Sequence, residues 1–395
     1  MNQQQITQWR LDTPGVQHRI HFNNAGAALP PSTVINVQRN YLEAEAIMGG
    51  YELAALKREE IQATFQSVAK LLNTKAQNIA FANNATDAYS RALSSVPLEA
   101  GDTILTTRND YVSNIISFLQ LQKHMDIQLV LAENAADGTV DVQSVAELIT
   151  QKRPKLVAVT HIPTSSGLVQ DVAAIGALCA AEDIWYLVDA CQSVGQLPLD
   201  VQAIRCDFLS ATGRKFLRGP RGTGFLYVSD KALQAGLEPF FLDLHSAEWT
   251  SQDQYRPVDS ANRFEIWERN YGLMLGLKSA ADYLLEQDMN LINQRIINLA
   301  SALRDKLSEF SSLHVMEKDT IKSGIVTVKV NDYEALAFQG ALLEQKINTS
   351  LIYQEGARYD LAQNKAPWVS RISVHYYNTM EEIDQLAEAL RRIVT

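Results

Sequence analysis

Short apolar runs alternate with amphipathic stretches between about residue 78 and residue 230. Five of the runs are predicted to be strands: NIAFA (78–82), DTILTT (102–107), IQLVLAE (127–133), KLVAVTHI (155–162) and IWYLVDA (184–190). Between the last two lies VQDVAAIGALCAAED, whose apolar residues recur at helical spacing. A strand–helix–strand order with wholly apolar strands predicts a mostly parallel sheet covered by helices on both faces, and hence an α/β fold.

The pattern changes after about residue 262. Long helical patterns within GLMLGLKSAADYLLE and INLASALRDKLSEF precede the alternating runs GIVTVKV and VSRISVHYY, which predict antiparallel strands. Thr379 and Glu382 form a capping box that begins a last amphipathic helix. We therefore expect a large α/β domain over residues 18–260 and a smaller α+β domain over 261–395, with residues 1–17 packing near the junction.

The composition fits a globular protein of this kind, since 46% of the 395 residues are hydrophobic and 20% are charged. The net charge of −10 argues against nucleic acid or an anionic membrane as the main partner. The opening stretch lacks the apolar core of a secretory signal, and no apolar run reaches the roughly 18 residues of a membrane span. Three unevenly spaced cysteines suit a reducing compartment, so a cytoplasmic location is expected.

Polar residues follow the predicted strands at the edge where parallel sheets bind ligands. NNATD (83–87) turns from a strand into a helix, whose free N–H groups can bind an anion or can simply be capped. Asp189 ends the strand IWYLV, where a buried carboxylate needs a positive partner or several donors. An equally good interpretation is that Asp189 caps the next helix.

The segment SATGRKFLRGPRGTGFLYV (210–228) carries Arg214, Lys215, Arg218 and Arg221 within eight positions of an acidic chain. Burial and neighbouring like charges favour a neutral lysine amine, which can form a Schiff base with an aldehyde. Pyridoxal phosphate offers an aldehyde, a phosphate and a ring nitrogen, for which Lys215, the 84–87 loop and Asp189 are candidate partners. A nucleic-acid loop is the alternative, which the acidity and the apolar flanks oppose. Arg218 and Arg221 fit a surface turn as well as phosphate or dimer contacts.

An ordered set of motifs now becomes recognisable: NNAGAALPP (23–31), NNATDAY (83–89), THIPTSSG (160–167), VDACQSVG (188–195), SATGRKFLRGPRGTGFLYV, FEIWE (264–268) and SRISVHYYNTMEEID (370–384). From about residue 18 to the end, the chain resembles the class-V aminotransferase family of fold-type-I pyridoxal-phosphate enzymes. That family includes cysteine desulfurases, isopenicillin-N-epimerase-like proteins and C–S lyases. The resemblance implies pyridoxal 5'-phosphate as cofactor, an amino acid as small-molecule substrate and a homodimer.

By position, the resemblance makes Lys215 the Schiff-base lysine and Asp189 the partner of the pyridine nitrogen. It implies that Gln192 binds the phenolic oxygen of the ring. The residues it implies for the phosphate are Ala85, Thr86 and Thr212.

On the substrate side, the resemblance makes Arg371 the clamp for the α-carboxylate and places Asn24 in the substrate-side loop. Three departures from the family pattern concern the cofactor. Tyr111 stands where the family has a stacking histidine, Thr164 replaces an asparagine, and Arg214 replaces a histidine and can pair with phosphate.

The cysteine pattern separates the family's reactions. Desulfurases need a mobile cysteine before the C-terminal arginine motif, and no cysteine occurs between Gly213 and Thr395. Cys191 lies in the turn after Asp189 and is interpreted as a packing residue. Desulfuration through a persulfide on the protein is therefore not expected. The resemblance of the 160–228 segment to C–S lyases of the family implies C–S β-elimination on a cysteine-derived substrate; the alternative is an aminotransferase or amino-acid epimerase that uses the same residues. His161 lacks HExxH or CxxC partners, so no metal site is expected.

Overall fold

A seven-stranded sheet forms the centre of the computed structural model, which describes residues 3–317, 323–363 and 365–394. Its strands, in order across the sheet, are β2 (Ile79–Ala82), β8 (Gly224–Val228), β7 (Phe208–Thr212), β6 (Trp185–Asp189), β5 (Leu156–Thr160), β3 (Thr103–Thr107) and β4 (Gln128–Ala132). All pairs are parallel except those of β8, which is antiparallel to both neighbours. The predicted α/β class with a mostly parallel sheet is confirmed.

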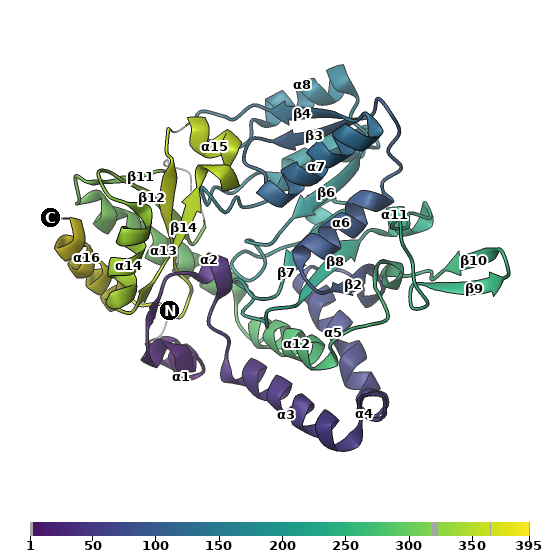
Figure 1. The fold of residues 1–395 in the computed structure, drawn as a ribbon, viewed down its shortest axis with the longest axis horizontal. Helices are drawn as coiled ribbons and strands as arrows, with labels where there is room; N and C mark the ends of the chain where they lie inside the picture. Colours follow the sequence, from purple (N-terminus) through teal and green to yellow (C-terminus); the bar gives the residue numbers. More distant parts are fainter. Residues whose placement is uncertain (1–2, 318–322, 364, 395) are drawn as a thin grey trace.

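Both faces of this sheet are buried, as the uninterrupted apolar runs predicted. In β5, Leu156 and Ala158 pack into one hydrophobic core, and Val157 and Val159 pack into the other, because successive side chains point to opposite faces. Helices α5 (Arg58–Leu71), α8 (Val142–Lys152) and α9 (Val172–Ala181) contribute to one core. Helices α6 (Ala85–Ser95) and α7 (Val112–Met125) contribute to the other (Figure 1).

A second sheet of four strands is antiparallel throughout, as its alternating sequence predicted. Its order is β11 (Leu313–Val315), β12 (Ile325–Val330), β15 (Trp368–Ser373) and β14 (Ser350–Tyr353). Helices α13 (Met289–Ser308) and α14 (Ala335–Glu344) pack on it, and α16 (Met380–Val394) packs against both of these helices. The capping box is confirmed, because Thr379 N donates to Glu382 Oε2 at 3.2 Å and Glu382 N donates to Thr379 Oγ1 at 3.3 Å.

The N-terminal segment joins the two sheets. Strand β1 (Ile20–His21) pairs with β13 (Ile347–Asn348) beside the smaller sheet. Ahead of it, α1 (Gln3–Leu11) places Arg10 against Glu382 at 2.8 Å. Helices α3 (Ser32–Met48) and α5 instead pack against α12 (Tyr271–Leu285), which places α12 beside the larger sheet. The division at residues 260/261 stays a prediction.

The remaining described elements lie around these two sheets: α2 (Asn24–Ala27), α4 (Gly50–Leu56), α10 (Val201–Ile204), α11 (Asp230–Gln234), the hairpin β9 (Ala247–Ser251)–β10 (Gln254–Pro257) and α15 (Arg358–Gln363). Figure 1 shows the β9–β10 hairpin projecting from the end of the molecule remote from the smaller sheet. None of the described helices combines the length and the apolar character needed to cross a bilayer.

Arg218 is one of the most completely buried large side chains, with 1% of its surface exposed. Its guanidinium carbon lies 5.6, 5.2 and 4.8 Å from the ring centres of Tyr283, Tyr376 and Tyr377. It donates to the carbonyl of Leu29 at 2.9 Å and to the Tyr376 hydroxyl at 2.6 Å. Neither a surface turn nor a phosphate contact describes this residue, because the aromatic cage holds its charge within the core.

We predict that Arg218→Ala lowers the free energy of unfolding by about 2–4 kcal/mol, because a cavity forms and buried acceptors lose their donor. Urea unfolding followed by tryptophan fluorescence measures the change. Arg221→Ala, in the same loop but exposed, is the matched control and should stay within about 0.5 kcal/mol of the parent protein. Equal stability of the two variants would show that the cage contributes nothing.

Candidate active site

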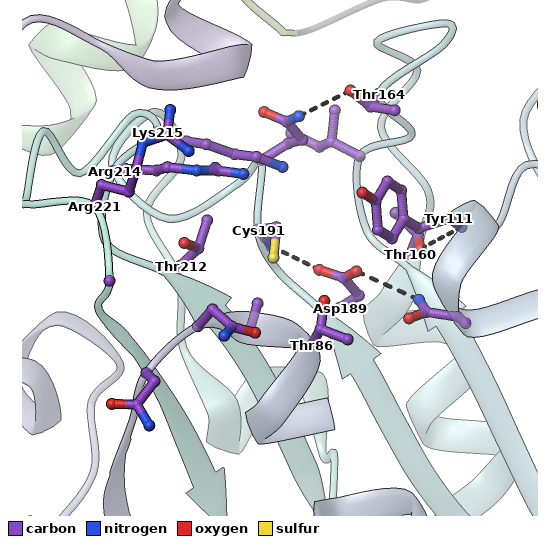
Figure 2. A pocket seen from close by; sticks show the side chains of 17 residues that line it. Thr86, Tyr111, Thr160, Thr164, Asp189, Cys191, Thr212, Arg214, Lys215 and Arg221 are labelled. Carbon is purple, nitrogen blue, oxygen red and sulfur yellow. Dashed lines mark hydrogen bonds between the residues drawn. The ribbon is translucent and has the colours of Figure 1, made fainter. Parts of the chain in front are cut away.

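A cavity of about 360 Å³ lies at the carboxyl ends of β5, β6 and β7 (Figure 2). This is the edge at which parallel sheets place their ligands. Every residue predicted to contact the cofactor lines it: Ala85, Thr86, Tyr111, Thr164, Asp189, Gln192, Thr212, Arg214 and Lys215. Asp189 and Thr212 are the last residues of their strands, so the ends of β6 and β7 carry these two side chains into the cavity.

The Lys215 side chain points into the cavity, with its Nζ 6.0 Å from the centre of the Tyr111 ring. Burial lowers the pKa of Lys215 below its ordinary value of 10.5. The negative charge of Asp189 opposes this shift, and the positive charges of Arg214 and Arg371 add to it. The result is an amine that gives up its proton more readily than an exposed lysine, as nucleophilic chemistry requires.

One end of the cavity is built to hold an anion. Helix α6 begins there, and its N-cap Asn84 accepts only from the third helical residue, Asp87, at 2.9 Å. The N–H groups of Ala85 and Thr86 have no acceptor within the helix and are available to a ligand. Arg214 lines the same cavity and has a buried Nη1 with no hydrogen-bond partner among the described residues.

The Asp189 carboxylate also lines the cavity and is 4% exposed. Its Oδ1 accepts from the Cys191 N–H at 2.9 Å, and its Oδ2 accepts from Asn114 Nδ2 at 3.4 Å. Cys191 also lines the cavity, beside this carboxylate (Figure 2). Burial, together with the nearby Asp189 charge, raises the pKa of the Cys191 thiol well above its usual range, so the thiol stays protonated.

Arg371 reaches the edge of the site from β15 of the smaller sheet. It donates to Thr164 Oγ1 and to Asn23 Oδ1, the latter at 3.3 Å, and its buried Nε has no partner among the described residues. Burial is the main cause that lowers the pKa of Arg371 to about 10, with the Arg214 charge as a second cause. Arg371 therefore remains a cation at neutral pH.

Gln192 lies between the two sides of the site. Its Nε2 donates to the carbonyl of Ala25 at 3.1 Å and to Thr164 Oγ1 at 3.0 Å. Its buried Oε1 has no partner among the described residues. An unpartnered buried amide oxygen is costly, so it marks a place where a ligand donor fits.

Asn24 does not reach the cavity. It is completely buried, and its Nδ2 donates to the carbonyls of His21 at 3.1 Å and Ser373 at 2.7 Å, while its Oδ1 accepts from the Tyr377 hydroxyl. These bonds occupy its polar atoms, so its contacts hold the fold together. The preceding residue, Asn23, is the one that contacts Arg371.

Among the polar residues that line the cavity, Asn114 and Thr160 had been given no role by the sequence, and the role of Arg221 had been left open. Asn114 lies one helical turn beyond Tyr111, so helical spacing from the stacking residue was a usable signal. Thr160 ends β5, at the same edge as Asp189. Arg221, for which a surface turn was an open alternative, lines the cavity with Arg214.

His161 is buried, and burial lowers its pKa to about 4, so its ring is neutral. It is not among the residues that line the cavity. Within residues 3–317, 323–363 and 365–394, no group of three or more His, Cys, Asp or Glu side chains is arranged to hold a metal ion.

The charges around the cavity test whether pyridoxal phosphate fits. Arg214, Arg221 and Arg371 supply three positive charges, and Asp189 is the carboxylate among the lining residues. A phosphate with about two negative charges and a substrate carboxylate with one would balance the three guanidinium groups. A protonated ring nitrogen would balance Asp189, and an aldehyde would meet the Lys215 amine. The residues present therefore fit this cofactor together with an amino-acid substrate.

Comparison with known proteins agrees with this geometry. The family model for aminotransferase class-V proteins matches residues 20–386. A probable cysteine desulfurase of Methanothermobacter thermautotrophicus is 28% identical over 394 residues, which cover 97% of each chain. A cysteine desulfurase of Yersinia pestis is 28% identical over 385 residues, covering 95% of this chain and 94% of the relative. The similarity therefore spans both sheets and the whole site.

Two solved structures share the fold. The apo structure of a cysteine desulfurase from Thermococcus onnurineus has a TM-score of 0.90 at 23% identity, covering 98% of this chain and 97% of its own. The cystine C–S lyase C-DES, in complex with its product cysteine persulfide, has a TM-score of 0.86 at 24% identity, covering 96% and 98%. At these identities the likeness concerns the architecture alone.

We predict that Lys215→Met stabilises the cofactor-free protein. Because the pKa of Lys215 is lowered on folding, the native state binds this proton more weakly than the unfolded chain does, and the cost is largest at neutral pH. Methionine removes the charge and keeps the length, so the free energy of unfolding should rise by about 1 kcal/mol near neutral pH. This gain should shrink as the pH rises toward 10.5, the ordinary lysine pKa.

Urea unfolding of the cofactor-free protein, at neutral pH and again near pH 10.5, measures the effect. Lys155→Met is the control, because the Lys155 side chain is exposed, and it should change the free energy by less than about 0.5 kcal/mol at either pH. A loss of stability in Lys215→Met at neutral pH would contradict the assigned cost of burying this amine.

Proposed function

Because the chain belongs to the aminotransferase class-V family, we propose that it catalyses C–S β-elimination on a cysteine-derived amino acid. It is a pyridoxal-phosphate-dependent enzyme, and we assign the lysine that carries the cofactor to Lys215. The observation that carries the proposal is the convergence of this amine, the Asp189 carboxylate and three guanidinium groups on one cavity.

In this proposal the phosphate binds to Thr86, Thr212, Arg214, Arg221 and the first N–H groups of α6. Asp189 keeps the ring nitrogen protonated, Gln192 contacts the phenolic oxygen, and Tyr111 lies against the ring. Bound pyridoxal phosphate supplies an electron sink for the negative charge that develops at Cα. Arg371, held by Thr164 and Asn23, binds the α-carboxylate of the substrate.

The neutral Lys215 amine then acts as general base, because the Cα–H proton passes to its Nζ. The electron pair left at Cα forms the Cα–Cβ double bond as the Cβ–S bond breaks, and the sulfur leaves with that bond's electrons and takes up a proton. Hydrolysis of the remaining three-carbon unit gives pyruvate and ammonia. Atoms and electrons balance without an external oxidant or reductant.

The cysteines favour elimination over transfer of sulfur to the protein. The chain contains Cys179, Cys191 and Cys206 and no others. Cys179 and Cys206 are buried in the core, and burial raises the pKa of Cys179 to about 12. Cys191 lines the cavity as a protonated thiol. A sulfur acceptor needs a reactive thiolate, so the sulfur is expected to leave with the departing fragment.

The names of the relatives support a sulfur amino acid as substrate, because they are cysteine desulfurases and a cystine C–S lyase. Transamination and epimerisation remain the alternative, since both would use Lys215, Asp189 and Arg371 in the same positions. Only the fate of the sulfur and of the amino group separates these reactions.

We predict that the holoenzyme releases pyruvate and a sulfur species in equal amounts from cystine, cysteine, a cysteine thioether or a cysteine sulfoxide. Lys215→Ala should lose both the visible absorption of the bound cofactor and the reaction. Cys191→Ala should keep sulfur release, because no protein thiol takes part. Transfer of the amino group from alanine to a 2-oxo acid, without sulfur release from any of the four compounds, would overturn the proposal.

We also propose that the protein is a cytoplasmic homodimer. The described cysteines are all free thiols, as a reducing compartment allows. An apolar surface on the 240–255 segment carries five large exposed side chains: Phe240 at 66%, Phe241 at 86%, Leu244 at 73%, Trp249 at 78% and Tyr255 at 57%. They lie on and beside the projecting β9–β10 hairpin (Figure 1). A cluster of this size marks a protein interface, and a second copy of this chain is the proposed occupant.

Sedimentation analysis should give a species of twice the chain mass of 44.0 kDa. The double variant Phe241→Asp/Trp249→Asp should shift it to the monomer, since two charges would then be buried in the interface. Leu336→Asp on α14, where the side chain is 67% exposed, is the control and should remain dimeric. A monomeric parent protein contradicts the prediction.

A further inference from the structure

A second buried carboxylate, Asp110, lies behind the site and is 8% exposed. Its two oxygens accept four hydrogen bonds. Oδ2 accepts from the Thr106 hydroxyl on β3 at 2.5 Å. Oδ1 accepts from the Tyr111 N–H at 2.6 Å, from the Thr160 hydroxyl on β5 at 2.6 Å and from Asn114 Nδ2 on α7 at 2.9 Å. One oxygen atom thus joins the start of a helix to the end of a strand.

The three donors to Asp110 Oδ1 all line the active-site cavity, whereas Asp110 itself does not. The Asn114 amide is shared, because its Nδ2 also donates to Asp189 Oδ2 at 3.4 Å. An amide placed between two carboxylates must present its NH₂ group to both. Asp110 therefore fixes which way the Asn114 side chain points, and through it one of the contacts that orient Asp189.

The main chain of Tyr111 is also bound to Asp110 Oδ1. Its side chain lines the cavity and is 36% exposed. Its main chain is fixed by the bond to Asp110 and by a second bond from the Tyr111 N–H to Thr160 Oγ1 at 3.1 Å. The position of the ring over the site thus depends on the backbone, and the backbone depends on Asp110.

The cost of this arrangement indicates a role beyond packing. Burial raises the pKa of Asp110 to about 6, against the hydrogen bonds from Thr106, Thr160 and Asn114, and the neighbouring charge of Asp189 raises it further. Two carboxylates close together in a protein interior are unfavourable unless something requires both. An apolar residue at position 110 would pack without this cost.

We propose that Asp110 is a positioning residue, whose Oδ1 holds the Tyr111 main chain and the Asn114 amide so that the Tyr111 ring and the Asp189 carboxylate meet the pyridoxal ring in register. The inference rests on the proposed function, because it concerns the ring that Lys215 and Asp189 bind. It assigns to Asp110 no contact with the cofactor or the substrate.

Two variants separate this role from a purely structural one. In Asp110→Asn, the side-chain oxygen can still accept all three bonds, and the new NH₂ group can donate to Thr106 Oγ1, which is able to accept. In Asp110→Ala, the three donors lose their acceptor. We expect Asp110→Asn to keep the cofactor dissociation constant and visible spectrum of the parent within about twofold. We expect Asp110→Ala to weaken cofactor binding by about 10–100-fold and to shift the visible band.

Titration of the cofactor-free proteins with pyridoxal phosphate, followed by visible absorption, measures both quantities. Asp141→Ala is the control: Asp141 caps α8 away from the site and accepts from Gln143 N at 2.9 Å. This variant should lose some thermal stability but keep the parent affinity and spectrum. Asn114→Ala keeps Asp110 but removes the amide that links it to Asp189, so this variant should also weaken cofactor binding. It serves as the second test if Asp110→Ala does not fold.

An unchanged affinity and band in Asp110→Ala, or in Asn114→Ala if the former does not fold, would overturn the inference. So would an Asp110→Asn protein as impaired as Asp110→Ala, because its acceptor is retained. Failure of the proposed function looks different: the parent protein itself would then show no visible band with pyridoxal phosphate, or none that depends on Lys215.

Discussion

The buried positive charge of Arg218 is the constraint on which the site depends, because Arg218 belongs to the loop that carries Lys215. Arg218 is enclosed by three tyrosines from the C-terminal half of the chain and hydrogen-bonded to the N-terminal segment at Leu29. The backbone of the same loop is fixed from both sides, since the Ala28 N–H donates to the carbonyl of Arg214 at 2.9 Å and His375 Nε2 bonds to that of Phe216 at 3.0 Å. Lys215 lies between Arg214 and Phe216, so the backbone bonds of these two neighbours fix the position from which its side chain extends.

This arrangement explains why the sequence predicted some parts well. A wholly apolar run such as 155–162 can be buried only inside a covered sheet, and a polar residue after such a run lies at the binding edge. Asp189 and Lys215 follow strands in this way, and local sequence was enough to single them out, whereas Thr212 came from the family resemblance. The antiparallel insertion of β8 between β2 and β7 left no such local trace, because apolar content is the same in either direction.

The parts that could not be predicted depend on distant partners. Arg218 reads as a loop residue until Tyr376, 158 positions away, closes over it. Asn23 and Asn24 are adjacent and chemically identical, so only the path of the chain decides that the first contacts Arg371 and the second is enclosed by Ser373 and Tyr377. Asp110 offered no signal of its own, since its importance comes from four donors on three different elements.

The Thr164 hydroxyl shows how the two sheets act as one site. It accepts from Gln192 Nε2, on the cofactor side, and from Arg371, which β15 brings from the smaller sheet. A hydroxyl oxygen that accepts two donors has its lone pairs occupied, so its own hydrogen is left to point elsewhere. In the proposed function, a substrate carboxylate accepts from Arg371 and can also accept the Thr164 hydrogen, which neither existing bond uses. Binding of that carboxylate therefore involves both sheets, because Arg371 belongs to β15 of the smaller sheet and Thr164 follows β5 of the larger one.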